Sequence, residues 1–193
     1  MASRLGKVLT PLLLLCACPL PAAAQDVPPG FHLARDASAL VHEGSGYTFP
    51  SRVGEFTRTD EWSRDPTGEY VAIRYDYSPA QGEPIILHLA LVHIGEMSAH
   101  EHYAAIKPQA QRFFSAISLK SEGPVKNPRV GKAAFRGTFS GERNGKPWEF
   151  SLTTVELGDW AGRLTAAYPA SQAKAATSAI DDFIAAFPKT PAK

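Results

Sequence analysis

The sequence predicts an α+β domain in which an antiparallel β-sheet of about six strands packs with two main helices. Two segments, 70–78 and 84–94, have the residue-by-residue alternation of strands. Apolar residues then recur every three or four positions, as in an amphipathic helix, and three more strand-like segments and a closing helix follow. Because no strand–helix–strand repeat is visible, a doubly wound parallel sheet is not expected.

The two early strands differ in how much of each face is apolar. In 70–78, apolar and aromatic residues alternate with polar ones, which predicts a half-buried strand. In 84–94, Ile85, Leu87, Leu89 and Leu91 fill one face, and the other face is also largely apolar. This second strand is therefore expected at the centre of its sheet, covered on both sides.

The first helix begins with a capping signal. Ser98 precedes Glu101 by three residues, the spacing at which a serine and a glutamate cap each other's backbone N–H groups. Pro108 interrupts the helix and predicts a kink, because proline removes one backbone hydrogen bond and the pattern continues in phase beyond it. The apolar stripe of this helix consists of Tyr103, Ile106, Ala110, Phe113 and Ile117.

The second half of the chain predicts an antiparallel meander from strands at 129–140, 148–157 and 160–168. Asn144-Gly145 separates the first two, and these residues tolerate the positive φ angles of a tight hairpin turn. Ser171 is the expected N-cap of the last helix. The apolar stripe of that helix is Ala176, Ile180, Phe183 and Phe187.

The N-terminal segment 1–24 has the pattern of a secretory signal peptide, with early basic residues, an apolar run and small residues before Gln25. We expect a flexible arm at 25–45, one α+β domain at 46–188 and a disordered tail at 189–193. The predicted location is the periplasm of a Gram-negative bacterium, and no segment predicts a transmembrane helix. A lipid anchor at Cys18 is an alternative processing route.

Three short motifs, at 46–50 (GYTFP), 164–169 (LTAAYP) and the helix 171–187, resemble PsbP and Mog1-like α/β/α sandwich proteins in element order. The chain also resembles small exported proteobacterial proteins of unassigned function. The resemblance implies a fold and assigns no functional residue.

Net charge argues against nucleic acid as a partner. The chain has 20 Lys and Arg against 19 Asp and Glu, with no basic cluster gathered on one predicted face. A nucleic-acid-binding domain normally shows such a basic surface.

A histidine-rich segment, 93–103 (HIGEMSAHEHY), is the sharpest candidate for metal binding. Copper or zinc could be held at the junction of strand and helix by His93, Met97 and His100 or His102, because imidazole and thioether suit these ions. Spacing argues against chelation, since His100 and His102 are two residues apart on a helix and diverge around its axis. The capping box explains the same residues as a helix entrance.

No nucleophile, base and orienting group can be matched by spacing, so the sequence predicts no enzyme and no cofactor. An active site drawn from distant residues such as Asp76, Ser78 and His88 stays open without positive support. The hypothesis is a non-catalytic exported domain that binds a protein partner or small ligand. Binding would use its sheet surface or the cleft between the sheet and the kinked helix.

Overall fold

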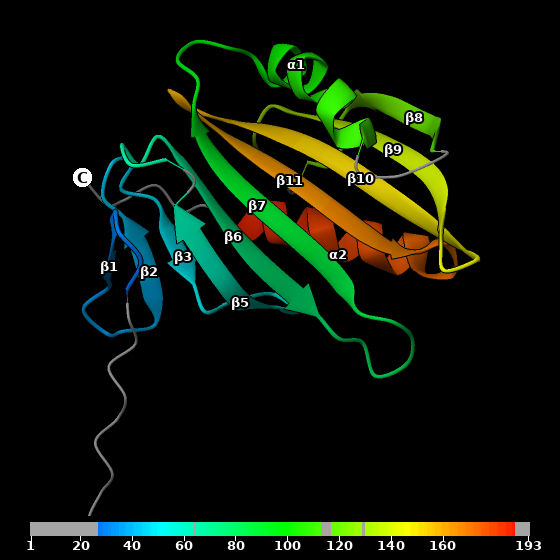
Figure 1. Cartoon of the computed structure of the whole chain (residues 1–193), viewed down its shortest axis with the longest axis horizontal. Coiled ribbons are helices and arrows are strands. Elements are labelled where there is room, and N and C mark those ends of the chain that lie inside the picture. Colours follow the sequence, from blue (N-terminus) through cyan, green and yellow to red (C-terminus); the bar gives the residue numbers. More distant parts are fainter. Residues whose placement is uncertain (1–26, 64, 113–116, 129, 188–193) are drawn as a thin grey trace, which may run out of the picture.

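The structure, a computed structural model, describes residues 27–63, 65–112, 117–128 and 130–187. The expected signal peptide, the alternative anchor at Cys18 and the expected tail at 189–193 lie outside these residues. The predicted α+β class is confirmed: two sheets pack with two α-helices (Figure 1).

The large sheet has eight strands, more than the predicted number, and every neighbouring pair is antiparallel. Their spatial order is β4 (Arg52–Val53), β5 (Phe56–Ser63), β6 (Tyr70–Tyr77), β7 (Ile85–His93), β11 (Trp160–Pro169), β10 (Lys146–Leu157), β9 (Ala134–Arg143) and β8 (Ser118–Pro124). The predicted meander is therefore confirmed as β9–β10–β11. Asn144 and Gly145, at φ 53° and 71°, form its first turn.

Two strands of a separate three-stranded sheet lie within the segment 25–45 that was predicted as a flexible arm. Strands β1 (Phe31–Leu33) and β2 (Ala39–His42) pair with each other, and β2 pairs with β3 (Thr48–Pro50). Phe31 and Leu40 are buried in the main core. The expectation of an arm was wrong here because strands this short show too few alternations to be recognised.

The two helices lie on opposite faces of the large sheet (Figure 1). Helix α2 (Ala173–Ala186) buries Ala176, Ile180 and Phe183 of the predicted stripe. The Phe183 ring packs edge-on against Phe56 and Tyr75, so this face of the sheet contains the main core. The predicted cap is wrong, because Ser171 lies in the 3-10 turn η1 (Ala170–Gln172) and the N-cap of α2 is Gln172, without a side-chain cap.

Helix α1 (Ala99–Arg112) continues through Pro108 and packs on β9 and β10. It therefore covers only part of its face of the sheet. On the same face of β7, Ile86 and Val92 are half-buried and His88 is exposed. The prediction that this strand is covered on both sides was thus wrong for one face. We call the uncovered part of β6, β7 and β11 the open face.

Candidate functional site

A groove of about 670 Å³ lies where the side of α1 meets the open face. Its volume is in the range of small-ligand pockets, roughly 300–1,000 Å³. Most of the residues that line this α1 groove are apolar. They are Tyr70, Ala72, Ile86, His88, Leu89, Ala90, Ile106, Gln109, Ala110, Arg143, Phe150, Leu152, Arg163, Thr165, Ala166 and Ala167.

Strand register builds the floor of the groove. Residues directly opposite one another on paired strands share a face, so Ala72, Ala90 and Arg163 form one row across β6, β7 and β11. The next row in the groove contains His88 and Thr165. Small side chains at Ala72 and Ala90 leave room above the sheet, which a larger pair would fill.

Apolar side chains occupy the floor farther along the strands. Ile86, Ala167 and Phe150 lie opposite one another across β7, β11 and β10. This row is four residues from Arg163 on β11, or about 13 Å at a rise of roughly 3.3 Å per residue. The floor of the groove therefore leads from Arg163 to a row of apolar side chains.

Above the floor, helix α1 forms a side wall of the groove. Hydrogen bonds fix the start of this helix. The predicted capping box is confirmed: Ser98 N–H donates to Glu101 Oε2 at 2.9 Å, and Glu101 N–H donates to Ser98 Oγ at 3.2 Å. Two residues of β10 hold the same turn to the sheet. Ala99 N–H donates to Glu156 Oε1 at 2.8 Å, and Thr154 Oγ1 donates to the Ala99 carbonyl at 2.6 Å.

Farther along α1, the side chain of Tyr103 ties the helix to β8. Its hydroxyl donates to Glu122 Oε2 at 3.0 Å, and Lys107 Nζ donates to the same oxygen at 2.6 Å. Ile106, Gln109 and Ala110 then face the groove. A capped and tethered helix gives the groove a wall that is in place before any ligand arrives.

The charged side chains that line the groove, Arg143 and Arg163, are both basic. Arg163 donates a hydrogen bond to the hydroxyl of Tyr70, and its guanidinium carbon lies 5.3 Å from the centre of the Tyr70 ring. Arg143 lies over the ring of Trp148 at 4.7 Å. No Asp or Glu is among the described residues that line the groove, so its electrostatic potential favours anions.

His102 lies on α1 four residues before Ile106, one helical turn from the groove wall. It is only 5 % exposed, and its Nε2 has no hydrogen-bond partner among the described residues. Burial, and to a lesser extent the positive charge of Arg163, lowers the pKa of His102. Burial and the nearby Arg163 guanidinium therefore both favour the neutral form of this imidazole.

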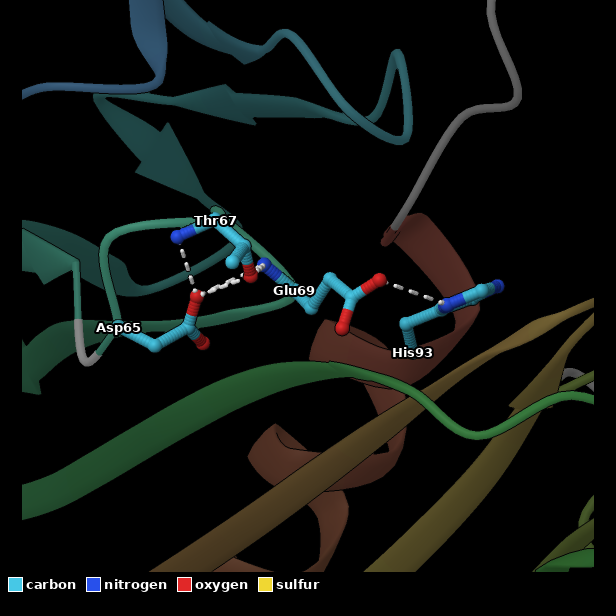
Figure 2. A network of polar contacts seen from close by, with 4 residues as sticks. All are labelled: Asp65, Thr67, Glu69 and His93. Carbon is cyan, nitrogen blue, oxygen red and sulfur yellow. Dashed lines mark hydrogen bonds and ion pairs between the residues drawn. The ribbon is translucent and has the colours of Figure 1, made fainter.

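The candidate metal ligands lie in different surroundings. His93, at the end of β7, has its ring centroid 5.0 Å from that of Trp160. Its Nδ1 is 3.6 Å from Glu69 Oε1, next to a loop in which Thr67 Oγ1 donates to Asp65 Oδ1 at 2.6 Å (Figure 2). His93 thus contributes to a network between β6 and β7.

The other three candidate ligands do not share one environment. Met97 is 39 % exposed, His100 is exposed with its ring 4.6 Å from that of Phe135, and His102 is buried. Within the ranges that the structure describes, no three His, Cys, Asp or Glu side chains gather in a way that could hold a metal ion.

The residues considered for an active site are only partly neighbours. Asp76 Oδ1 accepts a hydrogen bond from Arg74 Nε at 2.8 Å, while His88 lies opposite Arg74 and Thr165. His88 lines the groove, in agreement with the cleft that the sequence predicted between sheet and helix. Sequence reasoning missed Arg163 and its contact with Tyr70, because this contact crosses two strand pairings that only the register reveals.

The described helices include none that is long and apolar enough to cross a membrane. The fold and groove together define a small α+β domain with a half-covered sheet and an electropositive, mostly apolar groove.

A scan against family models and a search of curated proteins found no match. Among solved structures, the chain is similar to LpqN of Mycobacterium tuberculosis, which is involved in cell envelope biogenesis. The TM-score is 0.45 at 16% identity, and the match covers 67% of this chain and 75% of LpqN. It is also similar to the Ran-binding protein Mog1p of Saccharomyces cerevisiae, with a TM-score of 0.42 at 12% identity and coverage of 83% and 94%.

Proposed function

We propose that this protein is a non-catalytic, exported binding domain whose α1 groove takes a small ligand with an elongated apolar body. The observation that carries the proposal is the groove itself, about 670 Å³ in volume and lined mostly by apolar side chains. Ile106 and Ala110 of α1 and Ile86 and Ala167 of the sheet are among the apolar residues that line this space. A narrow apolar ligand would contact both walls.

Energetics support an apolar ligand. Each methylene group removed from water contributes roughly 0.8 kcal/mol, so a ligand that buries about eight of them gains about 6 kcal/mol. Part of this gain is offset by the cost of immobilising the ligand. Because α1 is already capped and tethered at Ser98, Ala99 and Tyr103, little further cost arises from ordering the protein.

Two variants test the proposal by filling the groove, one from α1 and one from the sheet. Ala110→Phe on α1 and Ala167→Phe on β11 each place a ring in the space that the ligand would occupy. Ala105→Phe is the matched control, because Ala105 lies on the exposed side of the same helix. Binding is followed by displacement of a fluorescent naphthylamine dye with methyl dodecanoate, and circular dichroism checks that each variant is folded.

We expect the wild-type protein and Ala105→Phe to bind the ester, and both groove variants to bind it at least about tenfold more weakly. Absence of binding by the wild type, or equal binding by all four proteins, would reject the groove as a ligand site.

Export is the second part of the proposal, and it is supported by the signal-peptide pattern at 1–24. Mass spectrometry of the protein isolated from cells tests it. A chain that begins at Gln25 is expected, whereas retention of Met1 would reject export and an acylated Cys18 would indicate a lipid anchor.

A further inference from the structure

We infer that the α1 groove is selective for amphipathic anions, with the carboxylate of a single-chain fatty acid or a similar acyl anion bound at Arg163. This inference rests on the proposed function, because it names the chemical class of the ligand that the groove would take.

Arg163 differs from the other half-buried arginines that the structure describes. Arg58 lies 3.7 Å from Glu61, Arg74 lies 2.8 Å from Asp76, and Arg136 lies 2.8 Å from Asp181. Among the described residues, no carboxylate lies within ion-pair distance of Arg163. A half-buried cation without a counter-ion is costly unless an anion or water meets it, so this position favours a negatively charged ligand.

Tyr70 holds the Arg163 side chain across the floor of the groove. The guanidinium donates to the Tyr70 hydroxyl and lies against the ring, although the two residues are on β11 and β6 with β7 between them. Ala90, opposite Arg163 on β7, is small enough for the side chain to pass over it. A guanidinium has several N–H donors in one plane, and those not used on Tyr70 suit a carboxylate.

The rest of the groove fits the apolar chain of such a ligand. From Arg163, the floor leads to the row of Ile86, Ala167 and Phe150, with Ile106 above it on α1. An acyl chain that extends in this direction would keep its carboxylate at Arg163. Arg143 is the competing anchor at the other end, but it is exposed on the β9–β10 hairpin, over Trp148.

The test compares dodecanoate, below its critical micelle concentration, with its uncharged methyl ester, below the solubility limit of the ester. Affinities are measured for the wild-type protein, for Arg163→Gln, and for Arg143→Gln, which removes the competing anchor and also takes one positive charge from the groove lining. Because hydrogen bonds to charged groups are stronger than those to neutral groups, the wild type is expected to prefer the acid by about tenfold or more. Arg163→Gln should bind acid and ester equally without weaker ester binding, and Arg143→Gln should keep the preference.

The outcomes separate the two proposals. Equal binding of acid and ester by the wild type overturns the anion selectivity and leaves the groove as an apolar site. A preference that survives in Arg163→Gln, or disappears in Arg143→Gln, overturns the assignment to Arg163. If the wild type binds neither compound, the proposed function fails and this inference fails with it.

Discussion

The hydroxyl group of Tyr103 lies directly above Gly137, so close that a Cβ atom at this glycine would be 2.0 Å from Tyr103 Oη. Tyr103 belongs to α1 and Gly137 to β9. The missing side chain at Gly137 leaves room for the Tyr103 side chain, so α1 can lie close to β9. A backbone position outside the groove lining therefore helps to place α1, which forms a wall of the groove.

Gly137→Ala is expected to destabilise the fold and displace α1. Tyr103 is buried and bonded to Glu122, so its ring cannot simply rotate away, and overpacking of this kind costs about 1–3 kcal/mol. Urea unfolding measures the loss. Gly123→Ala in β8 is the control, because nothing lies within 4 Å of the added Cβ, and it should leave the midpoint nearly unchanged. Equal midpoints for the two variants would contradict the close approach.

Ser98→Ala is expected to lower the free energy of unfolding by about 1 kcal/mol, the usual effect of losing a helix N-cap. The variant removes the Oγ that accepts the Glu101 N–H. Ser178→Ala, at an exposed position inside α2, is the matched control and should be neutral or slightly stabilising, since alanine favours helix. Thermal or urea unfolding compares them, and a stable Ser98→Ala variant would mean that the cap contributes little.

Acidification below about pH 6.5 is expected to destabilise the protein through two buried histidines. Burial is the main cause that lowers the pKa of His42, opposed by the Gly68 backbone and the charges of Glu43 and Asp65. Burial and Arg163 lower the pKa of His102. In both cases the unfolded chain takes up the proton at a higher pH than the folded chain, so stability falls as pH decreases through this window.

Urea midpoints at about pH 7 and about pH 5 measure this dependence. His102→Gln should lose less stability than the wild type over that interval. His32→Gln is the control, because the His32 side chain is 57% exposed, and it should keep the wild-type dependence. An equal loss in His102→Gln would show that His102 is not one of the responsible groups.

Copper and zinc are expected to bind weakly and equally to the wild type and to a His100→Ala, His102→Gln double variant. The His100 imidazole is exposed and lies beside Phe135, whereas the His102 imidazole is buried, so the two rings do not share a position for an ion. Calorimetric titration with each ion measures the affinities. Tight binding of one ion per wild-type chain that is lost in the double variant would restore the metal hypothesis.

Local patterns predicted the elements that are long and regular. The alternation in β6, the three-and-four spacing of α2 and the Ser98–Glu101 cap each depend on residues that are close in sequence. A single sequence is therefore enough to predict them. The strands β1 and β2 were missed because each is only a few residues long. Ser171 has the right side chain for a cap, but the chain first makes a 3-10 turn there.

The site could be predicted only in outline. Apolar residues on both sides of β7 indicated cover on both faces, whereas α1 packs on β9 and β10 and leaves the open face beside it. Which helix covers which strands depends on packing between distant segments, and the contact of Arg163 with Tyr70 depends on sheet register. The histidine-rich segment 93–103 was prominent in the sequence, but in the structure it contains the last residue of β7 and the first residues of α1.

The two faces of the large sheet carry apolar clusters of unequal size. The cluster beneath α2 extends through both sheets and most of the aromatic residues, whereas α1 rests on a small one formed by Tyr103, Ile106, Ala110, Phe139, Phe150 and Leu152. Helix α1 should therefore detach as a cooperative unit at a lower free energy than global unfolding, and its amide hydrogens should exchange with solvent before those of α2.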